Sequence, residues 1–189
     1  MVLVRPTSLA VLLAALVASV FGGCSTPAAP PDQQYIDQEK GFEITYPGNW
    51  KRWTGGIGQD LEIMPSDQTN PNVFRDNLLV HVETLTEGMT LDGFFASKVA
   101  AAEGADPEVE YQEIERLPVV LGGEDARRLV YSMSRDEAQV TSVVFFLVRG
   151  NRGYTILCSA ASERFDKRRP EFEKIVGTFK LEQAGPDRP

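Results

Sequence analysis

The sequence has few of the residues that catalytic and metal-binding sites most often use. Its 189 residues include one histidine, His81, and two cysteines, Cys24 and Cys158. A serine-histidine-aspartate triad or a histidine general base would have to use His81, and a zinc site needs three or four protein ligands. We therefore assign no catalytic, cofactor-binding or metal-ligating residue from the sequence, and do not expect an enzyme.

Positive charge is also in short supply. The chain carries 19 Lys and Arg against 27 Asp and Glu, a formal charge of -8. It has no Lys/Arg block with interleaved aromatic residues, and an acidic surface repels nucleic acid and anionic headgroups. Nucleic-acid binding is not expected.

A single apolar run, Leu9 to Gly23, follows the lone charged residue Arg5 and ends directly before Cys24. This layout is typical of a signal peptide, and the run is shorter than the ~20 apolar residues of a membrane span. Phe21-Gly22-Gly23-Cys24 resembles the lipobox of bacterial lipoproteins, whose cysteine is diacylated with palmitate-like chains and becomes the first residue of the mature chain. The alternative is a secretory peptide that is cleaved elsewhere.

The lipobox interpretation divides the chain into a signal peptide, residues 1–23; a Pro/Ala-rich tether, 24–34; a folded domain, 35–181; and a disordered tail, 182–189. It places the domain in the bacterial cell envelope, bound to the lipid bilayer through acylated Cys24. Ser25 after the cysteine predicts the outer membrane, facing the periplasm, in a Gram-negative host; in a Gram-positive host the outer face of the plasma membrane is expected. Lipidation leaves Cys158 without a disulfide partner, and the domain is expected to be monomeric.

Within the domain, period-two patterns predict strands and two periodic segments predict helices. Thr90 is expected to cap a helix that ends near Glu103, before Gly104. Gly150 to Gly153 predicts a tight hairpin turn. The remaining expected elements are strands at 35–37, 42–46, 50–53, 61–64, 78–82, 109–117, 124–134, 140–149 and 154–161, and a helix from Phe165 to Phe179 that contains Pro170. Leu78 to Val82 is apolar on both pleat faces, so we expect it to be covered from two sides.

Each remaining candidate for chemistry has a structural interpretation that is favoured. His81 lies mid-strand, and with Glu83 it could offer only two metal ligands. Cys158 has apolar and small neighbours, which favours a buried thiol over a nucleophile. The acidic residues Asp106, Glu108, Glu110, Glu113 and Glu115 lack calcium-loop spacing and favour a solvated strand edge. Trp50 is expected in the core, whereas Trp53 beside Gly55 to Gly58 is the better candidate for an exposed binding surface.

The order of elements and the segment Gly41-Phe42-Glu43-Ile44-Thr45-Tyr46-Pro47-Gly48-Asn49-Trp50 resemble the PsbP-like superfamily, which includes bacterial lipoproteins similar to DcrB and LpqN. The ending Phe172 to Phe179 matches as well. This resemblance implies an α+β fold, an α/β/α sandwich whose mainly antiparallel sheet is covered by helices on both faces. It also implies a non-catalytic accessory or assembly role, because members of this kind serve membrane complexes.

The sequence therefore predicts a membrane-anchored envelope lipoprotein that binds or assembles an envelope protein. A lipoprotein that binds a small ligand or a divalent metal is the alternative. A hydrolytic enzyme is third, because the inventory of acids and bases is so small.

Overall fold

The computed structural model describes residues 30–53, 58–68, 70, 73–104, 106–135 and 137–182. These residues form ten strands and two helices. The elements are β1 Gln33–Asp37, β2 Phe42–Tyr46, β3 Trp50–Arg52, β4 Leu61–Pro65, β5 Asn77–Thr84, α1 Leu91–Glu103, β6 Glu110–Leu121, β7 Glu124–Arg135, β8 Ala138–Arg149, β9 Arg152–Ala161, α2 Ser162–Val176 and β10 Lys180–Leu181. No helix in these ranges is long and apolar enough to cross a bilayer.

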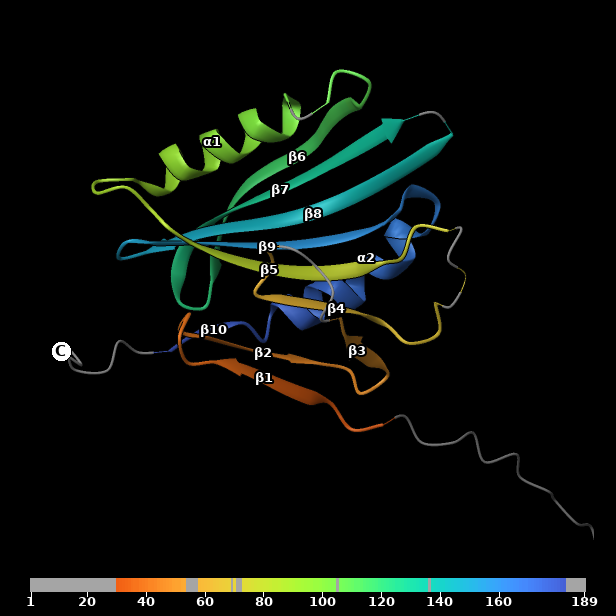
Figure 1. The fold of residues 1–189 in the computed structure, drawn as a ribbon, viewed down its shortest axis with the longest axis horizontal. Coiled ribbons are helices and arrows are strands. Elements are labelled where there is room, and N and C mark those ends of the chain that lie inside the picture. The colour runs from red at the N-terminus through yellow and green to blue at the C-terminus, as the bar shows by residue number, and fades with distance from the viewer. Residues whose placement is uncertain are drawn as a thin grey trace, which may run out of the picture.

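The strands form two sheets in which every pairing is antiparallel (Figure 1). The large sheet has seven strands in the order β3-β4-β5-β9-β8-β7-β6, so β6 forms one edge. The small sheet has the order β1-β2-β10 and brings the end of the domain beside its beginning. The sequence did not predict β10 or this separate sheet.

Tight turns join the long central strands, as the glycine pattern indicates. Gly150 has φ +61° between β8 and β9, which a residue with a side chain adopts only with strain. Gly153 serves a different purpose, because a Cβ atom built there would lie 2.7 Å from Cζ of Phe94 in α1. The absence of a side chain at Gly153 therefore lets α1 approach the sheet at the first residues of β9.

Helix α1 forms as the sequence predicts. The Thr90 hydroxyl accepts a hydrogen bond from the Gly93 amide, and the helix ends before Gly104. Its buried residues, Phe94, Phe95 and Val99, follow helical spacing and pack on Leu129, Val144 and Phe146 of the large sheet.

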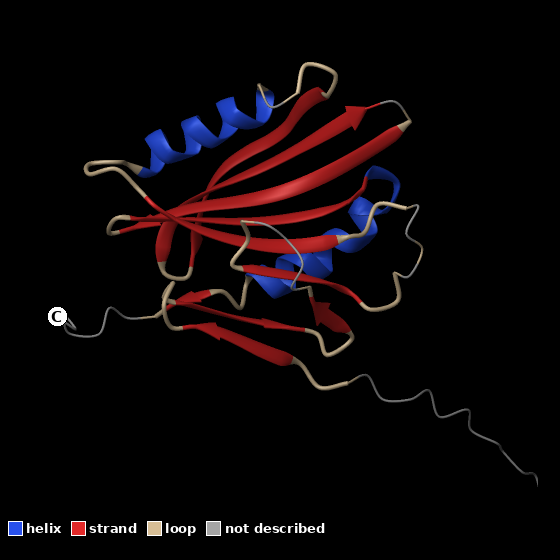
Figure 2. Ribbon diagram, viewed as in Figure 1, coloured by secondary structure: helices blue, strands red, loops and turns tan. Residues whose placement is uncertain are grey.

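Helix α2 lies on the other side of the large sheet (Figure 2). Pro170 lies inside it, and Phe165, Phe172, Ile175 and Val176 are buried. The helix ends three residues earlier than the predicted Phe179, whose ring instead stacks on Phe42 of β2 with centroids 5.7 Å apart. Packing of Phe179 against the small sheet therefore takes the place of the last helical turn.

The fold is a mixed α/β architecture with antiparallel sheets, and it corrects the expected sandwich in one respect. One face of the large sheet is covered by α2 and the small sheet, and this layer holds the larger core cluster. On the opposite face α1 covers only part of the strands. The two faces of strand β5 differ in burial. Leu78, Val80 and Val82 on one face are buried, whereas Leu79 and His81 on the other are half-buried. The prediction that β5 is covered from both sides was therefore wrong for its second face.

Candidate functional site

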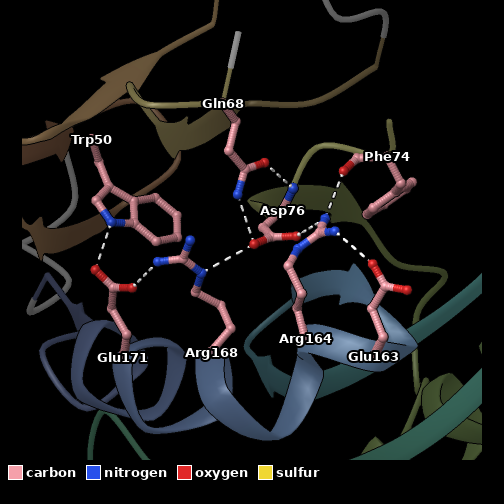
Figure 3. Close-up of polar contacts among 8 residues, drawn as sticks. All are labelled: Trp50, Gln68, Phe74, Asp76, Glu163, Arg164, Arg168 and Glu171. Atoms are coloured by element: carbon pink, nitrogen blue, oxygen red, sulfur yellow. Dashed lines mark hydrogen bonds and ion pairs between the residues drawn. The ribbon is translucent and has the colours of Figure 1, made fainter. Parts of the chain in front are cut away.

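A fully buried aspartate, Asp76, organises a polar network at the start of β5 (Figure 3). Its carboxylate accepts hydrogen bonds from Gln68 Nε2 at 2.6 Å, Arg164 Nη2 at 2.9 Å and Arg168 Nε at 3.0 Å. The Asp76 amide donates to Gln68 Oε1 at 2.7 Å. A buried carboxylate requires such partners, because desolvation of an unpaired charge is costly. The network joins the segment before β5 to the first half of α2.

The network continues to β3 through Glu171. Arg168 Nη1 donates to Glu171 Oε2 at 2.6 Å, and the indole nitrogen of Trp50 donates to Glu171 Oε1 at 2.8 Å. Burial alone would lower the pKa of Arg168, but its hydrogen bonds to Glu171 and Asp76 raise that pKa above its ordinary value. Arg168 therefore stays charged and links β3, α2 and the segment before β5.

Beside this network lies an exposed surface that we call the aromatic surface, defined as Trp53, Val73, Phe74 and Arg75. The exposed fractions of Trp53, Val73 and Phe74 are 50%, 43% and 40%. The guanidinium of Arg75 lies 6.0 Å from the centre of the Trp53 ring. Exposed aromatic residues next to an arginine are the side chains that dominate protein interfaces.

The Asp76 network fixes one part of this surface, the backbone at Phe74. Arg164 Nη2 donates to the carbonyl oxygen of Phe74 at 3.0 Å, in addition to its contact with Asp76. The backbone on which Phe74 lies is therefore fixed against α2 by two charge-assisted contacts. A contact residue on a fixed backbone loses little conformational entropy when a partner binds.

The sequence candidates for chemistry do not form a metal site among the described residues. His81 Nδ1 lies 3.7 Å from Asp60 Oδ2, on the half-open face of β5. Cys158 is fully buried in β9, as predicted, and burial raises the pKa of its thiol well above the ordinary value. Across the described ranges, no three His, Cys, Asp or Glu side chains lie close enough together to hold a metal ion.

The acidic segment lies at and before the edge strand β6, as expected, and most of its carboxylates pair with arginines. Asp106 and Glu108 pair with Arg135. Glu113 pairs with Arg116, and Glu115 pairs with Arg128. These ion pairs give the acidic residues a structural role on the sheet.

The two tryptophans have the environments that the sequence predicts. Trp50 is fully buried and Trp53 is half exposed. Cys24 and the loop residues Gly55 to Ile57 lie outside the described residues, so their predicted roles stay predictions.

Sequence reasoning missed the Asp76 network. Asp76 is separated from its arginine partners by 88 and 92 residues. One local signal was present: Arg164 and Arg168 are four residues apart, which places both on one face of a helix. Two arginines on one face of a partly buried helix indicate a buried acidic partner, but not which one.

Comparisons with known proteins identify the fold. Cyanobacterial PsbP (CyanoP) from Synechocystis superposes with a TM-score of 0.62 at 18% identity, covering 85% of this chain and 98% of CyanoP. LpqN, involved in cell envelope biogenesis of Mycobacterium tuberculosis, gives 0.57 at 14% identity, covering 82% and 87%. The Saccharomyces cerevisiae Ran-binding protein Mog1p gives 0.56 at 7% identity, covering 82% and 96%.

None of the curated protein sequences compared with this chain matches it. The family model for PsbP, in contrast, matches residues 32–181, from just before β1 to the end of β10. The chain therefore belongs to the PsbP family.

Proposed function

We propose that this protein is a lipid-anchored, non-catalytic accessory protein of the bacterial envelope that binds a protein partner through the aromatic surface. The observation that carries this proposal is the exposure of Trp53, Val73 and Phe74 beside the buried Asp76 network. Clusters of exposed apolar side chains mark interaction sites on the surfaces of proteins. The Arg75 guanidinium adds a charged group that an acidic partner would pair with.

The family supports an accessory role in the envelope. LpqN, a structural relative, is involved in cell envelope biogenesis, and Mog1p is a binding protein. Fold alone does not fix function, so the proposal depends on the residues of the site. The carboxylates and arginines of the Asp76 network are paired with each other and have a structural role. The exposed side chains beside them are therefore the ones available for recognition.

The anchor would place the aromatic surface near a membrane. Nine residues lead from Cys24 to the first strand residue, Gln33. Fully extended, they span at most about 30 Å. The domain would thus stay within about one domain diameter of the bilayer that holds the acyl chains, and its partner is expected in or close to that membrane.

Site-specific crosslinking in living cells tests the docking surface. A photoreactive amino acid at Val73 should give a discrete crosslinked protein, and Trp53→Ala in the same chain should weaken that crosslink. Ile114 on β6 is the matched control position, because it is 56% exposed and lies outside the aromatic surface. An adduct of equal strength from Ile114, or one from Val73 that is insensitive to Trp53→Ala, would refute docking at this surface.

The anchor has its own test. Cys24→Ser should abolish acylation and leave the precursor uncleaved by lipoprotein signal peptidase. Partition of the processed mutant into the detergent phase would show that the attachment does not depend on Cys24.

A further inference from the structure

Beyond the edge of α1, the large sheet bears an uncovered apolar trough of about 390 Å³. Its floor is made by side chains of four neighbouring strands, β5, β9, β8 and β7, and includes Leu79, Leu157, Val140, Tyr131 and Met133. Phe74 lines one side. This volume is in the range of small-molecule sites, which are mostly apolar with few polar groups.

A second cavity of about 350 Å³ adjoins the trough at Phe74, which lines both. Three arginines, Arg75, Arg164 and Arg168, and one carboxylate, that of Asp67, line this cavity. Asp76 fixes Arg164 and Arg168, which orients their remaining N–H groups in advance. Arg75 forms no ion pair with any carboxylate in the described ranges. An anionic group in this cavity would therefore gain a charge partner.

One polar atom at the trough also lacks a partner. Asn77 lines the trough, and its buried Oδ1 accepts no hydrogen bond within the described structure. Its side chain is hydrogen-bonded to Glu62. Since a buried acceptor without a donor costs free energy, a hydroxyl of a ligand in the trough would satisfy Oδ1.

A hydrocarbon chain fits this trough better than a peptide does. The floor is the face of a sheet, whose backbone N–H and C=O groups are already paired along the strands. A peptide lying there would leave its own backbone groups above apolar side chains. A hydrocarbon chain carries no such groups.

We propose that the trough holds the hydrocarbon chain of a single-chain anionic amphiphile, and that the anionic head group lies in the arginine-lined cavity. A fatty acid carboxylate and a lysophospholipid phosphate share this chemistry. The proposal goes beyond protein docking at the aromatic surface. The two sites share residues of that surface, including Arg75, but they are separable, because Ala138 and Met133 line the trough and not that surface.

Binding to a soluble form that begins at Ser25 tests the proposal. Every described strand and helix lies after residue 32, so this form keeps them all. Laurate, myristate and lysophosphatidylglycerols of the same chain lengths are titrated below their critical micelle concentrations by calorimetry. A fully buried methylene improves affinity about fourfold. Because the trough is open on one side, about twofold to fourfold per methylene is expected.

Comparing the affinities of the fatty acids and the lysophosphatidylglycerols identifies which class of amphiphile the site binds. Tighter binding of laurate than of its lysophosphatidylglycerol counterpart assigns the site to free fatty acids, and the reverse order assigns it to lysophospholipids. In either case Arg75→Gln should weaken binding of the anionic ligand at least fivefold. The same variant should bind the neutral dodecyl maltoside with unchanged affinity.

A filling variant and its control locate the site. Ala138→Trp adds an indole at the rim of the trough from an exposed position and should weaken binding at least tenfold. Ala101→Trp, also exposed but on α1, should bind as the wild type does. Affinity independent of chain length, no binding of any amphiphile, or wild-type affinity in Ala138→Trp would each overturn the proposal. A photoreactive amino acid at position 138 that captures a protein instead of a lipid would do so as well.

Discussion

Neutralising the buried carboxylate of Asp76 should destabilise the whole domain. In Asp76→Asn, Arg164 and Arg168 lose a fully buried anionic partner at 2.9 and 3.0 Å, while an asparagine oxygen can still accept from Gln68. Hydrogen bonds to charged groups contribute about 1.5–3 kcal/mol each. The side chains of Arg164 and Arg168 are 32% and 25% exposed, so solvent screens part of each interaction. The lower value of this range therefore applies to each of the two contacts. We expect a loss of about 3 kcal/mol.

Urea unfolding followed by tryptophan fluorescence measures this loss. Trp50 reports the transition because it is buried and bonded to Glu171 of the same network. The melting temperature should fall by roughly 6–12 °C, since each kcal/mol corresponds to about 2–4 °C for a domain of this size. The matched control is Glu163→Gln, which removes a 77% exposed carboxylate from the same arginine, Arg164.

Glu163→Gln should lower the free energy of unfolding by under about 1 kcal/mol, because exposed ion pairs contribute no more than that. Equal losses in the two variants would refute the reasoning, because burial of Asp76 would then contribute nothing. If Asp76→Asn does not fold, Arg168→Lys keeps the positive charge but loses the planar two-sided contact with Asp76 and Glu171, and an intermediate loss is expected.

Three further predictions follow from other parts of the structure. In the form that begins at Ser25, Cys158 is the sole cysteine and should react with a thiol reagent only on unfolding; fast labelling without denaturant would contradict its burial. Burial, with help from Glu113, raises the pKa of Tyr111 to about 12 from 10.0. Its contribution to stability is complete below pH 10.0 and is lost as pH rises towards about 12, so Tyr111→Phe should reduce the alkaline loss of stability seen by circular dichroism. Chelator, calcium, zinc and manganese should not change the melting temperature, whereas an ion at 100 times its Kd would add about 2.7 kcal/mol; a rise that His81→Ala removes would establish a metal site.

Local patterns in the sequence predicted the elements whose causes are local. Thr90, Gly104 and the apolar spacing between them define α1, and Gly150 defines the hairpin between β8 and β9. The cause of the buried Cys158 is also local, since its neighbours in β9 are apolar or small. Such features depend on residues a few positions apart, where propensity and periodicity are informative.

Long-range features were not predictable in the same way. Strand β6 continues to Leu121, past the predicted Leu117, although Pro118 lies within it. An edge strand tolerates proline, but only the topology reveals that β6 is an edge. The short β10 likewise depends on Phe42, far away in sequence, and the partners of Asp76 come from α2.

Two features explain why α1 leaves part of the large sheet uncovered: the helix is shorter than the strands, and Gly153 determines where it packs. Strands β7 and β8 have 12 residues each, about 40 Å when extended, whereas the 13 residues of α1 span about 20 Å. Gly153 admits Phe94 at the first residues of β9, which fixes α1 over that end. In the described part of the chain no helix therefore lies above the far end, around Leu157 and Ser159, although its floor is apolar. An exposed apolar floor beyond the reach of α1 is typical of ligand sites, and the chain-length series tests whether this floor is one.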